Sequence, residues 1–180
     1  MNILALDFET ADYGRDSACA LGLALIEDGA ITERHSILIR PPRRSFTFTY
    51  IHGITWDDVK DKPTFAEHWG DLAAWFARAE FCVAHNAPFD RGVLRSCCEH
   101  AGITPPVQPF LCTVRLARKL WHLKPAALPN VCDHFGIPLN HHDAASDTLA
   151  CASIMVHALT TLGGGEHPAF DTLRMLALKS

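Results

Sequence analysis

Four carboxylates stand where they could share metal ions. Asp7 and Glu9 lie two residues apart at the end of the first apolar run, and alternate residues of a strand point to the same side. Asp90 follows a second apolar run, and Asp147 lies near the start of a long helical segment. Polar strand ends are common, so the first pair alone is ambiguous. Close carboxylates repel, however, so four together indicate divalent cations, and oxygen ligands favour magnesium or manganese over zinc.

The stretch HHDAASD at 141 to 147 adds two histidines to these acids. A neutral imidazole with an ordinary pKa near 6.5 can take a proton from water. Nearby carboxylates favour its protonated form, and bound cations would offset that effect. Asp143 is interpreted as the N-cap of the helix that follows rather than as a further ligand.

These residues need a sheet and helices to bring them together. Apolar patterning predicts strands at 3–8, 18–26 and 31–39 as an antiparallel meander, followed by strands at 81–84 and 110–113 that alternate with helices. The helices are expected at 64–79, 89–100, 114–121, 128–135 (stopped by Gly136) and 143–162, with a long loop from 40 and a helical turn at 56–59. The predicted fold is α/β, with a mixed central sheet flanked by helices. Strand ends and helix starts then converge at one edge of the sheet.

Five ordered stretches resemble the motifs of the DnaQ-like, DEDDh-type 3′ to 5′ exonucleases, in the branch of DNA polymerase III epsilon-type proofreading domains. They are DFETA (7–11), IHGIT (51–55), VAHNAPFD (83–90), CTVRLAR (112–118) and HDAASD (142–147). The resemblance implies a ribonuclease H-like fold and an exonuclease domain over 1–162. It also implies two divalent ions, Mg²⁺ or Mn²⁺, held by Asp7, Glu9, Asp90 and Asp147. Cys112 departs from the pattern, since aspartate often precedes that threonine.

The same resemblance assigns the remaining site residues. His142 fits the register of the HxAxxD pattern and is implied to be the general base, which makes His141 a spare neighbour. Substrate contacts are implied for Phe8, Thr10, His52, Gly53 and Asn86. Asn86 could equally shape its turn, and His85 is interpreted as structural. Arg40, Arg43 and Arg44 form either a phosphate-contacting edge or a solvated loop.

The expected activity is removal of nucleotides from single-stranded 3′ ends of DNA, or of RNA, by two-metal hydrolysis with a histidine base. Alternatives are a weakly catalytic or non-catalytic polymerase-associated binding subunit and an RNA-specific exoribonuclease. A haloacid-dehalogenase-type phosphatase is disfavoured, because Glu9 stands where that chemistry needs a second aspartate. The expected partners are a polymerase subunit or a second copy of the chain.

Composition sets broad limits on this protein. The 180 residues suit one domain, and a net charge of −4 argues against wrapping long nucleic acid unless the acids hold cations. Seven cysteines without CxxC spacing favour buried thiols over a zinc site. No long apolar run or basic N-terminal flank occurs, so a cytoplasmic protein without membrane contact is expected. Residues 163–180 are interpreted as a glycine-rich linker and a C-terminal helix packed on the domain.

Overall fold

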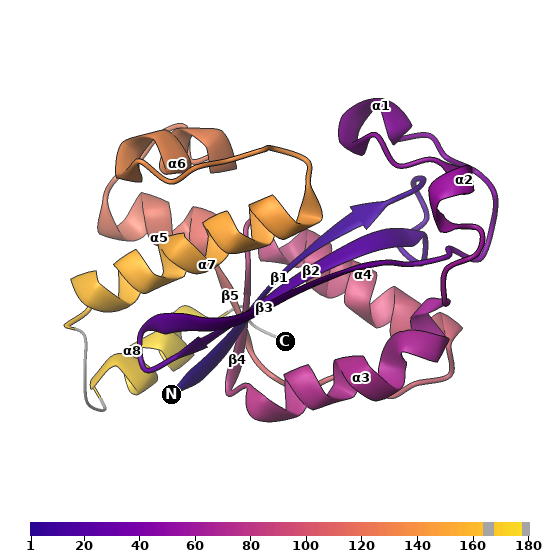
Figure 1. Ribbon diagram of the computed structural model, residues 1–180. Coiled ribbons are helices and arrows are strands. Elements are labelled where there is room, and N and C mark those ends of the chain that lie inside the picture. The colour runs from indigo at the N-terminus through magenta and orange to yellow at the C-terminus, as the bar shows by residue number, and fades with distance from the viewer. Residues whose placement is uncertain (164–167, 178–180) are drawn as a thin grey trace.

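A five-stranded sheet runs through the molecule, with its first strand in the middle (Figure 1). In this computed structural model, residues 1–163 and 168–177 are described. The sheet order is β3-β2-β1-β4-β5, with β2 and β3 antiparallel to their neighbours and β4 and β5 parallel to β1. The strands are β1 (Asn2–Thr10), β2 (Ala18–Glu27), β3 (Ala30–Leu38), β4 (Phe81–Ala84) and β5 (Phe110–Cys112). The predicted mixed sheet is confirmed.

Helices cover both faces of this sheet. On one face, α3 (Phe65–Arg78) and α4 (Ala87–His100) pack against Leu4, Leu6 and Phe8 of β1. On the other face, α5 (Thr113–Leu120), α7 (Ala144–Thr161) and α8 (Pro168–Leu176) pack against Ile3 and Ala5. A further helix, α6 (Leu128–Phe135), packs against the outer side of α5 and α7. Figure 1 shows the two layers on either side of the strands.

The alternation along β1 decides where its acids point. Even-numbered residues from Leu4 to Phe8 are buried under α3 and α4. Ile3 and Ala5 face α7, and the same period carries Asp7 and Glu9 to that side. The strand therefore presents its apolar residues to one helical layer and its acids to the other.

Two helix starts depart from the predicted ranges. Helix α4 begins at Ala87 rather than at residue 89, because Pro88 occupies a first-turn position where its fixed φ suits a helix. Within the segment predicted to be a loop, α1 (Thr49–His52) forms one turn that ends at Gly53 with φ 76°. One turn is too short to leave a periodic pattern. The turn predicted at 56–59 is confirmed as α2 (Trp56–Val59).

The C-terminal part is described only in pieces. Leu173 of α8 is fully buried against the face that holds Ile3. The glycine-rich segment 164–167 and the last residues, 178–180, lie outside the described residues, and so does that part of the predicted linker. Among the described helices, none is both long and apolar enough to cross a bilayer.

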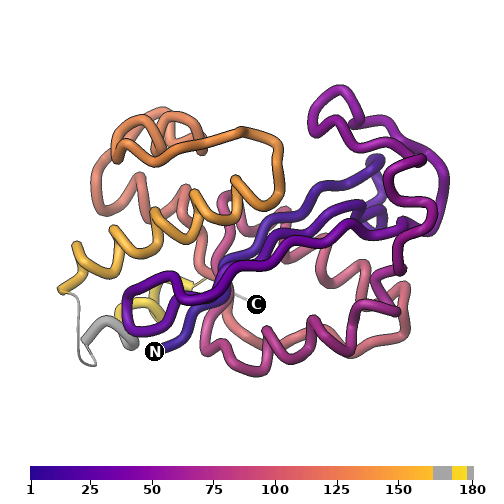
Figure 2. The backbone as a smooth tube through the Cα atoms, in the orientation of Figure 1, coloured from indigo at the N-terminus to yellow at the C-terminus, as the bar shows by residue number. Residues whose placement is uncertain are grey.

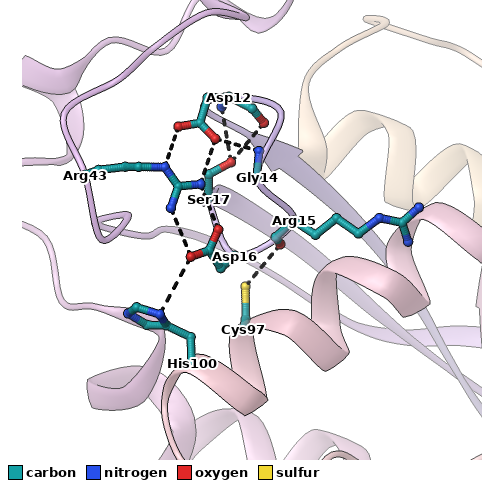
Figure 3. A network of polar contacts seen from close by, with 8 residues as sticks. All are labelled: Asp12, Gly14, Arg15, Asp16, Ser17, Arg43, Cys97 and His100. Atoms are coloured by element: carbon teal, nitrogen blue, oxygen red, sulfur yellow. Dashed lines mark hydrogen bonds and ion pairs between the residues drawn. The ribbon is translucent and has the colours of Figure 1, made fainter.

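The loop between β1 and β2 is tied to the segment that carries α1. The amides of Thr47 and Phe48 donate to the carbonyl of Ala11 at 2.7 and 3.1 Å, and Figure 2 shows the two segments side by side at one end of the molecule. Arg43 adds a side-chain clamp, since its guanidinium contacts Asp12 and Asp16 at 2.7 Å each (Figure 3). This clamp brings α1 to the end of β1.

Candidate active site

Strand β1 extends beyond its parallel neighbour, and its acids lie on the extension. β4 pairs only with Ile3 to Ala5, whereas β1 continues to Thr10 along β2. Asp7 and Glu9 therefore stand past the end of β4, at the edge where the helices following the parallel strands begin. This is the edge at which open α/β sheets place their sites.

Asp90 reaches the same point from the opposite helical layer. It lies in the first turn of α4, is 1% exposed, and its Oδ1 accepts a hydrogen bond of 3.0 Å from the Phe8 amide. A backbone donor of β1 beyond the end of β4 thus holds the carboxylate beside Asp7. The interaction fixes one oxygen of Asp90.

Asp147 arrives from α7 because that helix lies unusually close to the sheet. Gly22 of β2 stands opposite Asp7, and a Cβ there would collide with the Ala144 carbonyl and the Thr148 hydroxyl. Only glycine allows the first turns of α7 this near to the strand. Asp143 caps the helix by accepting from the Ser146 amide at 2.8 Å, as predicted.

The four carboxyl groups form one electrostatic cluster. Burial, and then the charges of Asp90, Asp147 and Glu9, raise the pKa of Asp7 well above its usual value. Burial and Asp147 raise the pKa of Glu9 to about 8, and burial raises that of Asp90 to about 7 and also that of Asp147. Without cations, the cluster is therefore held partly protonated.

The donor set fits divalent cations. Single carboxylate oxygens of Asp7, Glu9 and Asp147 lie within 4.8 Å of one another, close enough to surround an ion. Asp147 Oδ1 is buried and makes no hydrogen bond to any described residue. Oxygen-only ligands with an unsatisfied buried acceptor are suited to Mg²⁺ or Mn²⁺.

Both histidines of the 141–142 pair contact Asp147. His141 Nδ1 lies 2.9 Å from Asp147 Oδ2, and the His142 amide donates to the same oxygen at 3.1 Å. The rings stack with centroids 3.8 Å apart. The interpretation of His141 as a spare neighbour is thus wrong, because its ring is bound to a site carboxylate. His142 has φ 70°, and this left-handed backbone turns its ring out beside that of His141.

The pKa of His142 is not raised overall, although the sequence predicts that the nearby carboxylates favour its protonated form. Partial burial and then His141 lower its pKa, while Asp147 acts in the opposite direction. The net direction is downward, so the ring is biased toward its neutral form. Neutral imidazole is the form that can accept a proton.

The predicted substrate contacts divide into exposed and buried residues. The Phe8 side chain is 3% exposed and packs in the core, so only its backbone belongs to the site. Thr10 is also buried, and its carbonyl contacts His52 Nε2 at 3.1 Å. His52 Nδ1 accepts from the Ile54 amide, so Nε2 carries the proton and donates to Thr10. Gly53 is exposed at the end of α1.

Asn86 and His85 lie in the turn between β4 and α4. Asn86 is exposed with φ 69°, a left-handed conformation that asparagine tolerates well and that shapes this turn, whereas its contact with substrate stays a prediction. His85 shares a 2.8 Å hydrogen bond with Thr113, and burial lowers its pKa to about 4. A neutral, half-buried His85 agrees with its structural interpretation.

The arginines of the loop after β3 have partners within the protein. Arg43 is held by two aspartates, Arg40 lies 3.5 Å from Glu67, and the guanidinium of Arg44 lies 5.3 Å from the centre of the Trp56 ring. The loop is therefore not purely solvated, and a phosphate-contacting edge stays a prediction. In the described part of the chain, the groups able to share an ion contain no cysteine.

Three contributions to the site were missed from sequence. Gly22 sits within an apolar strand, and nothing there signals a helix in close contact. The His141 contact depends on the left-handed turn at His142. The Phe8 amide positions a site carboxylate because β4 pairs only with residues 3–5 of β1, and this register was not predicted, although the strand at 81–84 was.

Comparison with known proteins places the site in a family. The model of the RNase_T exonuclease family matches residues 4–155 and so spans all four acids and both histidines. The chain belongs to this exonuclease family. The predicted resemblance to DEDDh-type 3′ to 5′ exonucleases and the predicted enzyme class are thereby confirmed.

Relatives and solved structures agree with the assignment. This exonuclease is 34% identical over 147 residues to exodeoxyribonuclease 10 of Escherichia coli, covering 76% of the chain and 59% of the relative. It is 28% identical to the DNA polymerase III subunit epsilon of Pasteurella multocida, covering 93% of the chain and 70% of that subunit. Exonuclease X in complex with 5′ overhanging duplex DNA superposes with a TM-score of 0.74, 25% identity and 97% coverage of both chains.

Some relatives are much longer than this exonuclease. The PolC-type DNA polymerase III of Thermotoga petrophila is 30% identical over 157 residues, covering 85% of the chain but only 11% of the polymerase. The structure of exonuclease I, at 18% identity and a TM-score of 0.76, shares the fold over 97% of the chain and 43% of that structure. The ribonuclease H-like fold is confirmed.

Proposed function

We propose that this exonuclease removes nucleotides from single-stranded 3′ ends of DNA by metal-assisted hydrolysis. The observation that carries the proposal is the convergence of four carboxylates from β1, α4 and α7 at one sheet edge, next to two histidines. Their raised pKa values show that the cluster is costly without cations.

Asp7, Glu9, Asp90 and Asp147 would hold two divalent ions. When bound, such ions lower the pKa of water and stabilise charge on the attacking and leaving oxygens of a phosphodiester. Burial and the charges of Asp90, Asp147 and Glu9 all raise the pKa of Asp7, so its carboxylate would gain from cations bound by the whole cluster. The Phe8 amide keeps Asp90 oriented, and α7 keeps Asp147 at a fixed depth.

His142 would accept the proton of the attacking water. Its lowered pKa keeps the ring neutral near pH 7, and its exposed position gives it access to solvent and to a strand end. His141, by contrast, is bound through Nδ1 to Asp147, so we assign it to orienting that carboxylate. His52 fixes α1 beside the end of β1, where a terminal nucleotide would lie.

The choice of DNA is supported by relatives that act on it or bind it by name, an exodeoxyribonuclease and an exonuclease X complex. Polymerase III subunits among the relatives support association with a replicative polymerase as a second proposal. A homodimer and a cytoplasmic location stay predictions.

A side-by-side digestion tests the proposal. Matched 5′-labelled DNA and RNA strands and a duplex with a mismatched 3′ end are incubated with Mg²⁺ or Mn²⁺. We expect DNA ladders that shorten from the 3′ end, abolition by a chelator, and loss in Asp7→Asn. A 3′-terminal phosphorothioate should slow the first cut. Faster digestion of RNA than of DNA would identify RNA as the preferred substrate. If no nucleotide is released from any of the substrates, the proposed nuclease activity is wrong.

Co-purification decides the polymerase proposal separately. The tagged full chain is mixed with the polymerase III core subunits of its own organism, and a stable complex is expected on size exclusion. A failure to elute together would remove that proposal while leaving the nuclease activity untouched.

A further inference from the structure

Three arginines converge on a surface depression that the proposed mechanism does not use. The depression has a volume of about 270 Å³ and lies between the β1–β2 loop and α4. It is lined by Arg15, Pro88, Arg91, Gly92, Arg95, Ser96 and Glu99. Positive side chains thus dominate a small concave surface on a protein whose net charge is −4.

The local structure brings these arginines together. Arg91 and Arg95 are four residues apart on α4 and therefore share one face of the helix. Arg15 lies across that helix at Gly92, where a Cβ would collide with its guanidinium. Figure 3 shows the Arg15 side chain directed away from Arg43 and along α4. A contact of 3.8 Å from Cys97 Sγ to the Arg15 carbonyl ties the loop to the helix.

The acids of the β1–β2 loop do not pair with Arg15. Asp12 and Asp16, in the same loop as Arg15, are both committed to Arg43. Glu99 is the one carboxylate among the lining residues. Among the side chains of residues 1–163 and 172–177, no ion pair joins Arg15 or Arg95 to a carboxylate. Because arginine does not give up its proton, the cluster stays positive at every working pH.

The walls of the depression follow directly, along the chain, on segments that carry the acid cluster. Arg91 follows Asp90 directly, and Arg95 lies about 7.5 Å from Asp90 along the helix axis. Arg15 belongs to the loop that follows Asp7 and Glu9 on β1. Both walls are thus continuations of the segments that carry the metal ligands.

We propose that Arg15, Arg91 and Arg95 bind a phosphodiester group of the substrate strand other than the one being cut. Guanidinium groups bind phosphate oxygens through paired hydrogen bonds, and three of them can hold one or two phosphates of a strand leaving the site. This inference rests on the proposed function, because it requires a nucleic acid strand in the adjacent site. It assigns part of the affinity for the nucleic acid strand to a surface that contains none of the four catalytic carboxylates.

The test compares a substrate with one phosphate to a substrate with many. The p-nitrophenyl ester of thymidine 5′-monophosphate carries only the scissile group, whereas an oligonucleotide of about 20 residues also carries the others. In the Arg15→Ala/Arg95→Ala variant, we expect ester turnover to stay within about twofold and oligonucleotide affinity to fall about tenfold or more. Arg174→Ala, which removes an exposed arginine of α8, should change neither.

Salt dependence gives a second readout that a structural role would not produce. Binding is measured by fluorescence anisotropy in an Asp7→Asn background, so that no strand is cut. The slope of log affinity against log salt should fall by ~0.7 for each lost phosphate contact. The single variant Arg95→Ala should show an intermediate loss. A neutral methylphosphonate linkage at the contacted position should weaken the parent and leave the double variant unchanged.

The outcomes separate the two proposals. Equal losses with ester and oligonucleotide, an unchanged salt slope, or no binding by the parent would overturn the phosphate site. If the wild-type protein cleaves neither substrate, the proposed function fails, and the anisotropy series still decides whether these arginines bind a strand.

Discussion

At the scale of single residues, the two adjacent histidines have different surroundings. His141 holds Asp147 through its ring, whereas His142 contacts the same carboxylate only through its backbone amide. The His142 ring therefore stays available for a proton. Two neighbours with the same side chain thus divide orientation and proton transfer between them.

Replacing each histidine separately tests this division. We expect His142→Ala to lower kcat by about 10²–10⁴-fold with divalent binding retained, because the base is lost and the ligands remain. His141→Ala should weaken divalent binding and lower kcat less. Turnover of the single-phosphate ester and calorimetric titration with Mn²⁺ measure the two effects. Equal losses in both assays would remove the distinction.

The pH profile follows from the direction of the His142 shift. Its folded pKa lies below the usual value, and bound cations would lower it further. The logarithm of kcat/KM should therefore rise with pH, and the apparent pKa of this acid limb should lie below about 6.5, the ordinary value for histidine. In His142→Ala this acid limb should disappear. If the acid limb of the pH profile is unchanged in this variant, a group other than His142 is responsible for it.

At the scale of elements, the close approach of α7 to β2 decides the depth of Asp147. Gly22 and the first turns of the helix are in contact, and no larger residue fits between them. The helix is otherwise ordinary, with an aspartate cap and an apolar face on the sheet. The site thus depends on one glycine in a strand that contributes no ligand.

Substitution of Gly22 should show how strongly activity depends on the position of Asp147, because it changes none of the proposed catalytic residues. Gly22→Ala is expected to cost about 1–3 kcal/mol of stability and to lower activity at least tenfold, since α7 must move away from Asp7. Gly70→Ala is the matched control, because a Cβ there meets nothing within 4 Å and an exposed helical glycine gains from alanine. Urea unfolding and ester turnover measure both. Full activity in Gly22→Ala would show that the helix tolerates the shift.

The ion pairs of Arg43 with Asp12 and Asp16 hold the loop after β3 against the β1–β2 loop. Asp12 is 10% exposed, so removing its cation leaves a largely buried carboxylate unpaired. We expect Arg43→Ala to cost about 1–3 kcal/mol and to speed amide exchange at Thr47 and Phe48. Arg78→Ala, which breaks pairs with the more exposed carboxylates of Glu27 and Glu33, should change the free energy of unfolding much less.

The stability contributed by the ion pairs of Arg43 should depend on pH. Hydrogen bonds from Arg43 hold the pKa values of Asp12 and Asp16 below their usual range. The stabilisation is therefore present above the ordinary aspartate pKa and is lost as pH falls through the folded values. In Arg43→Ala, the corresponding part of the acid-induced loss should be missing from unfolding curves.

At the scale of the whole molecule, folding and metal binding are linked. The buried acids bind protons more tightly in the folded state, since burial raises their pKa values. The unfolded chain ionises them near pH 4, so the stability of the metal-free protein should decrease as pH rises toward the folded values.

Thermal unfolding in a chelator tests this linkage. We expect the melting temperature to be lower by roughly 5 °C at about pH 8.5 than at about pH 5.5. Mg²⁺ or Mn²⁺ should recover the loss at the higher pH. The Glu9→Gln/Asp90→Asn variant should show a flatter pH dependence and little metal effect. A metal-free protein equally stable at both pH values would contradict the raised pKa values.

Much of this molecule was readable from its sequence. The three antiparallel strands, the helix at 64–79 and the four acids follow from periodicities of two and 3.6, which survive in a single chain. The one-turn helix α1 and the contact of His141 with Asp147 do not, because each depends on a single left-handed residue. The arginine depression also escaped prediction, since Arg15 and Arg95 meet only after the β1–β2 loop folds onto α4.

The hydrogen bond from Phe8 to Asp90 means that sheet and site compete for one donor. If β4 grew by a few residues, its carbonyls would take the Phe8 amide into the ladder, and the carboxylate would lose its anchor. Insertions between β4 and α4 should therefore be tolerated only when they leave the strand short. The active site exists because the sheet stops where it does.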